Sequence, residues 1–321
     1  MSRIRLTILF ALVLAGLTIL SEAQTMKVTL LGTGSPDPSI VRFGPSTLVE
    51  AGTEKLLFDA GRGASQRLWQ LKIPFRQVTG LFITHLHSDH TVGIPDLWLT
   101  GWLPGPHGGR TTPLPVYGPE GTEAMMTSLR QAFQWDISVR TRGPAHLSES
   151  GITIIAKDIT QGVVYEHNGV KVTAFDVDHG AHLKPAFGYR VDYAGRSVVI
   201  SGDTRPNENL VQYAKRTDLL IHEVTSIRPE LLSKSEVARG IQALHTSPEE
   251  AGKLFERIKP RLAVYSHINL LTTDPSIPPP TLEDLRTRTN YSGPFEVGED
   301  LMQIEIGEKV EPHKFYETHK F

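Results

Sequence analysis

The stretch Thr84-His85-Leu86-His87-Ser88-Asp89-His90 places three histidines and one aspartate within six residues. A short apolar run, residues 81–84, leads into it and predicts a strand that delivers the chain to this point. Residues i and i+2 of an extended chain project to the same side, so His85 and His87 can hold one metal ion together. Asp89 and His90 follow where the chain turns and can serve a second ion nearby. Neutral imidazole and carboxylate are ligands that zinc accepts, so the motif predicts a site for divalent metal ions.

Outward from this motif, strands and helices alternate along the chain. Short apolar, β-branched runs predict strands at residues 26–31, 55–58, 81–84, 170–175, 197–200, 218–222 and 262–266. Apolar periodicity predicts helices at residues 64–71, 120–133, 208–214, 248–258 and 281–288. The segments 103–115 and 273–280, rich in proline and glycine, predict surface loops. No repeat or linker interrupts this order, which indicates one α/β domain over residues 24–306 and a polar C-terminal tail over residues 307–321.

The first 23 residues have the three regions of a secretory signal peptide. Arg3 and Arg5 give a positive start, an apolar run follows over residues 6–20, and Ser21-Glu22-Ala23 places small residues before a cut at Gln24. The alternative is an uncleaved membrane anchor, for which the run is short, because a spanning helix needs about 20 residues. The sequence therefore predicts a secreted or periplasmic protein with no stable membrane anchoring after cleavage.

The amino-acid composition limits the kinds of metal ligand and of binding partner. The chain has no cysteine, so imidazole and carboxylate must hold any transition metal. Its formal net charge of −2 gives no overall basic character, so the sequence favours no nucleic-acid partner, although a local basic patch is compatible with it.

The motif His-x-His-x-Asp-His resembles the signature of the metallo-β-lactamase-fold hydrolases. Other segments match the same superfamily in order: Leu31-Gly32-Thr33-Gly34-Ser35-Pro36, Phe58-Asp59-Ala60-Gly61, Val177-Asp178-His179, Phe187-Gly188-Tyr189-Arg190, Ser201-Gly202-Asp203-Thr204, Ile221-His222-Glu223, His245-Thr246-Ser247 and Tyr265-Ser266-His267. The resemblance covers about residues 26–306 and is greatest to the branch of ribonuclease Z and arylsulfatase-like exported hydrolases. It implies a four-layer αββα sandwich with the metals at one edge.

The resemblance also implies a ligand set. His85, His87 and His179 match the ligands of a first metal, Asp89, His90 and His267 match those of a second, and Asp203 matches the carboxylate that bridges both. His182 is a rival for His179, which is preferred because it directly ends a strand. Two Zn²⁺ per chain are expected, with Mn²⁺ or Fe²⁺ as alternatives.

Three further residues complete the expected site. Asp59 matches a position where a carboxylate orients a ligand histidine through its other ring nitrogen, and an ordinary turn aspartate is the alternative. Glu223 and His245 resemble the pair that acts as general acid in the ribonuclease Z branch, where an imidazole held by a carboxylate donates a proton. His245 could instead be only a loop residue before its helix. Asp89, Glu223 and His245 are the expected catalytic residues.

Two divalent ions with a shared water imply hydrolysis of an anionic ester, because the water would be deprotonated near neutral pH and act as a metal-bridging hydroxide nucleophile. Ribonuclease Z, which the chain resembles, has a protruding arm that binds tRNA, located between its third motif and its bridging aspartate. Here residues 189–196 run as a tight hairpin into the next strand and leave no room for that arm. The sequence therefore favours a small anionic ester, an aryl sulfate or a phosphodiester, over precursor tRNA.

Two other functions remain as alternatives at this point. One is a ribonuclease Z-like endoribonuclease that processes tRNA 3′ ends, and the other is a zinc-binding protein without catalysis. The sequence does not fix the oligomeric state, and a homo-oligomer is compatible with it.

Overall fold

The computed structural model describes residues 25–274, 276–278, 280–281 and 285–315. The predicted signal peptide, residues 1–23, lies outside the described residues. Among the described residues, no helix has both the length and the apolar character needed to cross a bilayer.

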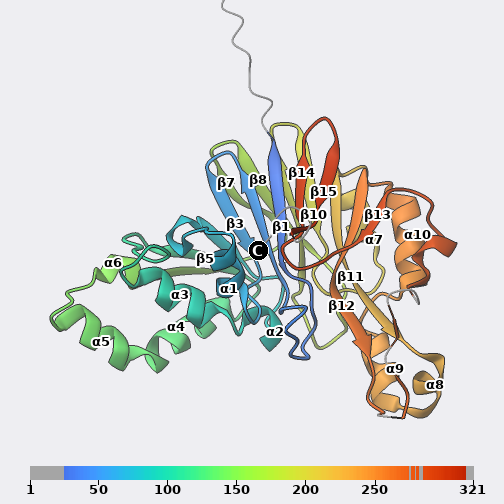
Figure 1. Ribbon diagram of the computed structural model, residues 1–321, viewed down its shortest axis with the longest axis horizontal. Helices are drawn as coiled ribbons and strands as arrows, with labels where there is room; N and C mark the ends of the chain where they lie inside the picture. Colours follow the sequence, from blue (N-terminus) through green and yellow to red (C-terminus); the bar gives the residue numbers. More distant parts are fainter. Residues whose placement is uncertain (1–24, 275, 279, 282–284, 316–321) are drawn as a thin grey trace, which may run out of the picture.

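Two β-sheets form the centre of the molecule (Figure 1). The first has eight strands in the order β15-β14-β1-β2-β3-β4-β5-β6. They are β1 (Met26–Gly32), β2 (Ser46–Ala51), β3 (Glu54–Phe58), β4 (Gly80–Phe82), β5 (Leu114–Gly118), β6 (Ile154–Asp158), β14 (Gln303–Ile306) and β15 (Val310–His313). From β3 to β6 neighbouring strands are parallel, whereas the pairs from β15 to β3 are antiparallel.

The second sheet has seven strands in the order β13-β12-β11-β10-β9-β8-β7. They are β7 (Gly162–His167), β8 (Val170–Asp176), β9 (Phe187–Tyr193), β10 (Arg196–Ile200), β11 (Leu219–Ile227), β12 (Leu262–Leu271) and β13 (Phe295–Val297). Strands β10 to β13 run parallel to one another. Parallel strands present their carboxyl ends at one edge, where ligands from different strands can meet.

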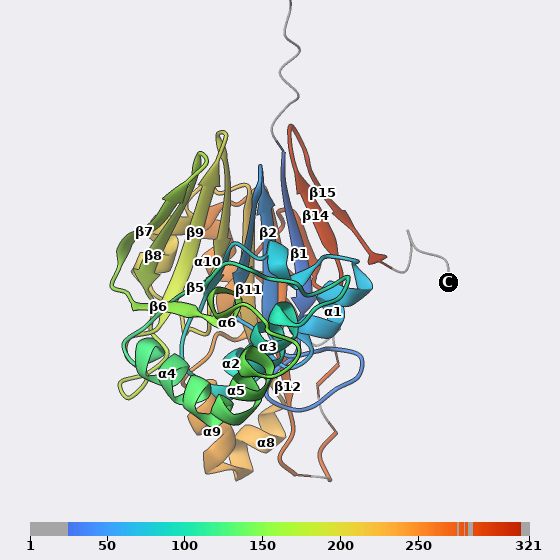
Figure 2. The ribbon, with the colours of Figure 1, turned by 90° about the vertical axis from the view of Figure 1, so that its left-hand side faces the viewer.

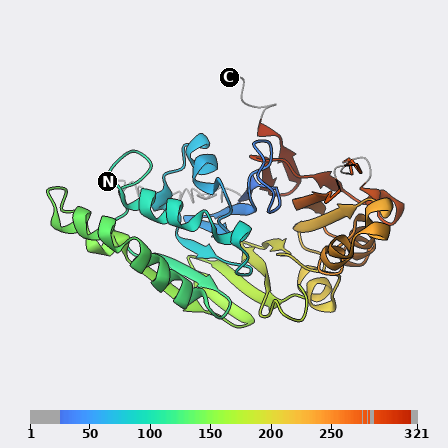
Figure 3. The ribbon, with the colours of Figure 1, turned by 90° about the horizontal axis from the view of Figure 1, so that it is seen from below.

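Helices cover the outer face of each sheet. The helices are α1 (Ala64–Gln70), α2 (Ser88–Thr91), α3 (Ile94–Trp102), α4 (Thr122–Ala132), α5 (Gln134–Arg142), α6 (Glu149–Ile152), α7 (Glu208–Ala214), α8 (Pro229–Lys234), α9 (Glu236–Gln242) and α10 (Pro248–Ile258), with short 3₁₀ turns η1 (Phe75–Gln77) and η3 (Arg286–Thr289). Seen from below, the teal and green helices α3–α5 lie on one side of the strands and the orange α10 on the other (Figure 3). Helices α8 and α9 project beyond the ends of β11 and β12 (Figures 1 and 2).

The apolar core has three layers that correspond to this arrangement. Val28, Tyr189 and Val264 belong to the cluster between the two sheets. A second cluster, including Trp98, packs helices on the first sheet, and a third, including Phe255, packs α7 and α10 on the second. The predicted αββα sandwich is therefore confirmed.

One predicted helix coincides with the observed one, whereas two other segments differ from their prediction. The helix predicted at 248–258 has the same bounds as α10, where Ser247 and Glu250 form a capping box. The helix predicted at 281–288 is absent from the described part of that segment, which instead contains η3 (Arg286–Thr289). The predicted tail is also not wholly irregular, because β15 pairs with β14 along the edge of the first sheet.

Candidate metal centre

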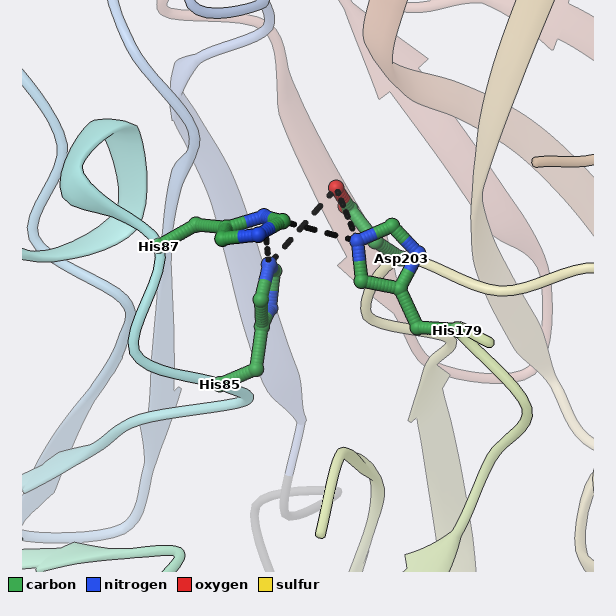
Figure 4. Close-up of side chains that lie close together, drawn as sticks. All are labelled: His85, His87, His179 and Asp203. Atoms are coloured by element: carbon green, nitrogen blue, oxygen red, sulfur yellow. Dashed lines mark hydrogen bonds and ion pairs between the residues drawn. The ribbon is translucent and has the colours of Figure 1, made fainter. Parts of the chain in front are cut away.

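Three histidines and one aspartate from separate parts of the chain point toward one another (Figure 4). His85 and His87 lie in the segment between β4 and α2, His179 follows β8, and Asp203 follows β10. The chain leaves β4 at Phe82, bends at Thr84 and is extended at His87, the residue before α2. The predicted strand at residues 81–84 thus ends two residues earlier, and both histidines of the motif still face the same space.

The distances in this first group suit one ion. His85 Nε2 lies 2.9 Å from His87 Nδ1, and His179 Nε2 lies 3.4 Å from the same nitrogen. Asp203 Oδ2 lies 3.9 Å from the Nε2 atoms of both His85 and His179. Two ligand atoms on a tetrahedral zinc, each at about 2.0–2.1 Å, are roughly 3.4 Å apart, so these separations bracket the expected value.

A second group shares Asp203 with the first. His267 Nε2 lies 3.2 Å from Asp89 Oδ2 and 3.3 Å from Asp203 Oδ2. His90 Nε2 lies 3.6 Å from Asp89 Oδ2 and 3.5 Å from Asp203 Oδ2. Asp89 and His90 are in α2, while His267 sits in β12 with a left-handed φ of 44° at a one-residue bulge in the β11–β12 pairing. The seven residues thus form two adjacent ligand groups.

Three polar atoms of these residues lack a partner within the protein. Asp203 Oδ1, His90 Nε2 and His267 Nδ1 are buried and have no hydrogen-bond partner among the described residues. Buried polar atoms are normally paired, and Nε2 of His90 and the carboxylate of Asp203 face the space between the ligands. These residues therefore fit a divalent metal site.

The pKa shifts follow from the same crowding. Burial, and then the neighbouring His90, hold the pKa of His85 well below the ordinary histidine value, which keeps its ring neutral as a ligand requires. Burial also acts to lower the pKa of His90, but Asp203 and Asp59 prevail and raise it well above that value. Without metal, a proton on His90 balances part of the negative charge of Asp203 and Asp59. A bound cation would take over this role, so metal binding should release protons.

Asp59 lies directly behind the second group. Its Oδ2 accepts from His90 Nδ1 at 2.8 Å and from Thr84 Oγ1 at 2.8 Å, and its Oδ1 accepts from Thr84 N at 2.8 Å. The carboxylate therefore fixes the ring of His90 so that Nε2 faces the other ligands. This is the placement expected of an orienting carboxylate rather than of an ordinary turn residue.

Glu223 and His245 lie beside the ligands. His245 Nδ1 is 3.3 Å from Glu223 Oε1, which also accepts from the backbone N–H groups of Thr246 and Thr204. Burial of His245 disfavours its charge, but Glu223, with a smaller contribution from Asp203, raises its pKa to about 9. His245 could also share an ion, because it forms a further group with Asp203 and His267.

A cavity of about 280 Å³ opens at the ligands. His87, Asp89, His179, Asp203, His245 and His267 line one part of it, and Ser35, Pro36, Asp37, Ile241, Leu244, Asn269 and Leu271 line the rest. A larger cavity of about 770 Å³, lined by Arg228, Arg239 and Gln242 among others, contains none of the proposed ligands. The smaller cavity is therefore the candidate substrate site.

Sequence patterns found some of these residues and missed others. His179 joins the ligand cluster, whereas the rival His182 is exposed. Residue type does not reveal the role of Leu244, because its backbone oxygen, 3.1 Å from His179 Nδ1, is the atom that makes the contact. Asn269 also lines the cavity, and its position two residues after His267 is the one signal of this in the sequence.

Comparison with known families gives one match over most of the chain. The model of the β-lactamase superfamily domain matches residues 54–268, a segment that includes all seven residues of the two ligand groups.

Curated relatives and solved structures agree with this match. The chain is 36% identical to a ribonuclease Z of Mycobacterium sp. (strain KMS) over 290 residues, 88% of this chain and 96% of that protein. It is 34% identical to a ribonuclease Z of Mycobacterium tuberculosis (strain H37Rv), with 88% and 98% covered. In fold it resembles the metallo-β-lactamase fold protein YhfI from Bacillus subtilis (TM-score 0.67, 18% identity, 88% and 100% covered) and the short form of human tRNase Z (TM-score 0.63, 23% identity, 87% and 98% covered).

Proposed function

Because the chain belongs to the β-lactamase superfamily and, within it, to the relatives of ribonuclease Z, we propose that it is a metal-dependent endoribonuclease that cleaves a phosphodiester bond near the 3′ end of an RNA such as precursor tRNA. The observation that carries this proposal is identity of 34–36% to ribonuclease Z over 88% of the chain. Membership of the β-lactamase superfamily by itself supports a metal-dependent hydrolase of the metallo-β-lactamase fold.

The expectation of a small anionic ester, an aryl sulfate or a phosphodiester, in preference to precursor tRNA is contradicted by the relatives named ribonuclease Z. It rested on the absent arm, and β9 and β10 are indeed joined by a tight turn at Ala194 and Gly195. However, the 290 aligned residues cover 88% of this chain and 96% of the mycobacterial relative, so that relative has no long insertion that this chain lacks. A protein named ribonuclease Z therefore does without the arm, and its absence does not favour another substrate.

The expectation that no nucleic acid is favoured also conflicts with these relatives. That expectation used the net charge of −2 for the whole chain. Binding of a phosphodiester depends instead on the field at the site, and two divalent ions would add four positive charges beside His87 and His179.

The residues of the cavity support phosphodiester hydrolysis. Divalent ions held by the seven ligands would supply Lewis-acid activation of a water and of a phosphoryl oxygen. Asp59 holds the ring of His90, and the Leu244 carbonyl holds that of His179, so the ligand geometry is set before substrate arrives. His245, with its proton retained by Glu223, lies at the cavity and can donate that proton to the leaving oxygen.

The test is cleavage of an RNA with a 3′ trailer by purified, metal-replete protein, with the cut mapped to the nucleotide. We expect a single cut at the trailer junction, abolished in His85→Ala and retained in His182→Ala, a matched control because His182 is exposed and outside the ligand groups. Hydrolysis of bis(p-nitrophenyl) phosphate without cleavage of the RNA would refute the proposal and leave only the metal-dependent hydrolase.

A further inference from the structure

One wall of the cavity is built by the strand that carries His267. Beyond the bulge at this ligand, β12 alternates in the usual way. Ile268 and Leu270 pack into the outer core with α10, so Asn269 and Leu271 project to the opposite side, where both line the cavity. The strand thus extends the metal centre into a second region of the same cavity.

Asn269 is the unusual member of this wall. The residue as a whole is only 8% exposed, and none of the residues that the structure describes forms a hydrogen bond with its amide. The amide atoms are not among the fully buried unpaired atoms, so they reach the cavity that the residue lines. Its donor and its acceptor are therefore both available to a molecule that enters the cavity. An unpaired amide that is placed at a cavity, on a residue that is otherwise buried, points to a ligand that completes its hydrogen bonds.

The surroundings of this amide are apolar. Ile241, near the end of α9, and Leu244, just after it, line the same cavity as Leu271. Helix α9 is held in place because Ile241 and Leu271 belong to the small apolar cluster that joins α8, α9 and β12. The region therefore offers flat apolar contact together with one side chain that both donates and accepts hydrogen bonds.

A nucleobase has this combination of properties. Its faces are apolar and its edges carry donors and acceptors, which an asparagine amide can contact with two hydrogen bonds. Asn269 is two residues from His267, about 6–7 Å along the strand, so one nucleotide could place its phosphate at the ligand groups and its base at the amide.

We propose that Asn269, with Ile241 and Leu244, forms a subsite that binds the base of the nucleotide next to the scissile phosphodiester and selects among bases. Asn269 is then a specificity-determining residue that contacts the base edge, while the two aliphatic side chains contact the base face. The inference rests on the proposed function in taking the substrate to be RNA.

The test is equilibrium binding by calorimetry to metal-replete protein, with the four nucleoside 5′-monophosphates and ribose 5-phosphate as probes. We expect at least one nucleotide to bind more tightly than ribose 5-phosphate, which has the same phosphate and no base. Asn269→Leu, similar in volume, should weaken that nucleotide by roughly 5- to 150-fold, the range for one bidentate contact to a base, and leave ribose 5-phosphate within about twofold.

Two further variants make the result specific. Ile241→Ala should weaken base-dependent binding and keep the metal content, since it removes only apolar contact. Asn209→Ala is the control, because this asparagine lines a different cavity and, among the described residues, its amide donates to the Asp176 backbone oxygen. Equal binding of all probes to the wild-type protein, or an unchanged preference in Asn269→Leu, would overturn the subsite. Base-dependent binding that Asn269→Leu removes, in a protein that cuts no RNA, would support the subsite and refute the proposed ribonuclease.

Discussion

Replacement of His245 by alanine should separate substrates by their leaving groups. His245 is 8% exposed, and Glu223 holds the proton on it by raising its pKa to about 9 against the effect of burial. A raised pKa favours the protonated ring, which is the form that a general acid requires. A ribose oxygen leaves poorly as an alkoxide and needs this proton, whereas p-nitrophenolate leaves readily without it.

The expected loss follows from that difference. General-acid catalysis contributes roughly 10²–10⁴-fold, which corresponds to about 3–5 kcal/mol of transition-state stabilisation. His245→Ala should lose activity in this range on RNA, and within about threefold on bis(p-nitrophenyl) phosphate. Single-turnover rates on both substrates, with elemental analysis of each protein, measure the effect.

A companion variant uses the charge of Glu223. Glu223→Gln removes the negative charge that retains the proton, so the pKa of His245 should fall. The acid is active when protonated, and the alkaline limb of the RNA-cleavage profile should therefore move to lower pH. Equal losses on both substrates, or loss of metal in His245→Ala, would refute the role as acid and assign His245 to the metal group that it forms with Asp203 and His267.

Three further predictions concern the ligands, the stability and the amino terminus. Asp59→Asn should weaken metal binding by roughly 10- to 100-fold while the fold is kept, measured by competition with a chelator, because this carboxylate orients His90; unchanged affinity would contradict this role. Glu54 is buried, and hydrogen bonds from Tyr165, Asn168 and His167 outweigh the effect of burial and lower its pKa to about 2. Its ionised form therefore stabilises the fold above the unfolded pKa of about 4.3, and this contribution is lost as pH falls toward 2. Glu54→Gln should thus lower the free energy of unfolding at pH 7 by roughly 1–3 kcal/mol, and denaturant titrations should show a smaller difference at pH 3.5; a constant difference would refute this linkage. The protein produced in its native host should begin at Gln24, and an intact mass that retains Met1 would refute removal of the leader.

Local sequence patterns correctly predicted elements whose bounds depend on residues close together in the sequence. The capping residues Ser247 and Glu250 lie within one turn of α10, and its predicted bounds are those observed. By contrast β2, β5 and β6 were not predicted, and β11 extends five residues beyond its predicted end at His222. These strands depend on pairing with residues distant in the sequence. For example, Thr225 of β11 pairs with Asn269 of β12.

The sequence by itself determined the metal chemistry. Four ligand residues lie between His85 and His90, and without cysteine only imidazole and carboxylate remain to hold the ions. Their spacing acts within a few residues, where backbone geometry fixes the direction of each side chain.

The resemblance named the distant ligands His179, Asp203 and His267, but only the tertiary structure brings them together with the motif. His179 contacts His87 although 92 positions separate them in the sequence, and His267 contacts Asp89 although 178 positions separate them. His182, only three residues after His179, is exposed instead. Asn269 is two residues after His267 in the sequence, but its place beside Ile241 of α9 in one cavity depends on the tertiary structure. The physical reason is that convergence depends on the order of strands in the two sheets and on the bulge at His267, and neither is encoded in the spacing of any one motif.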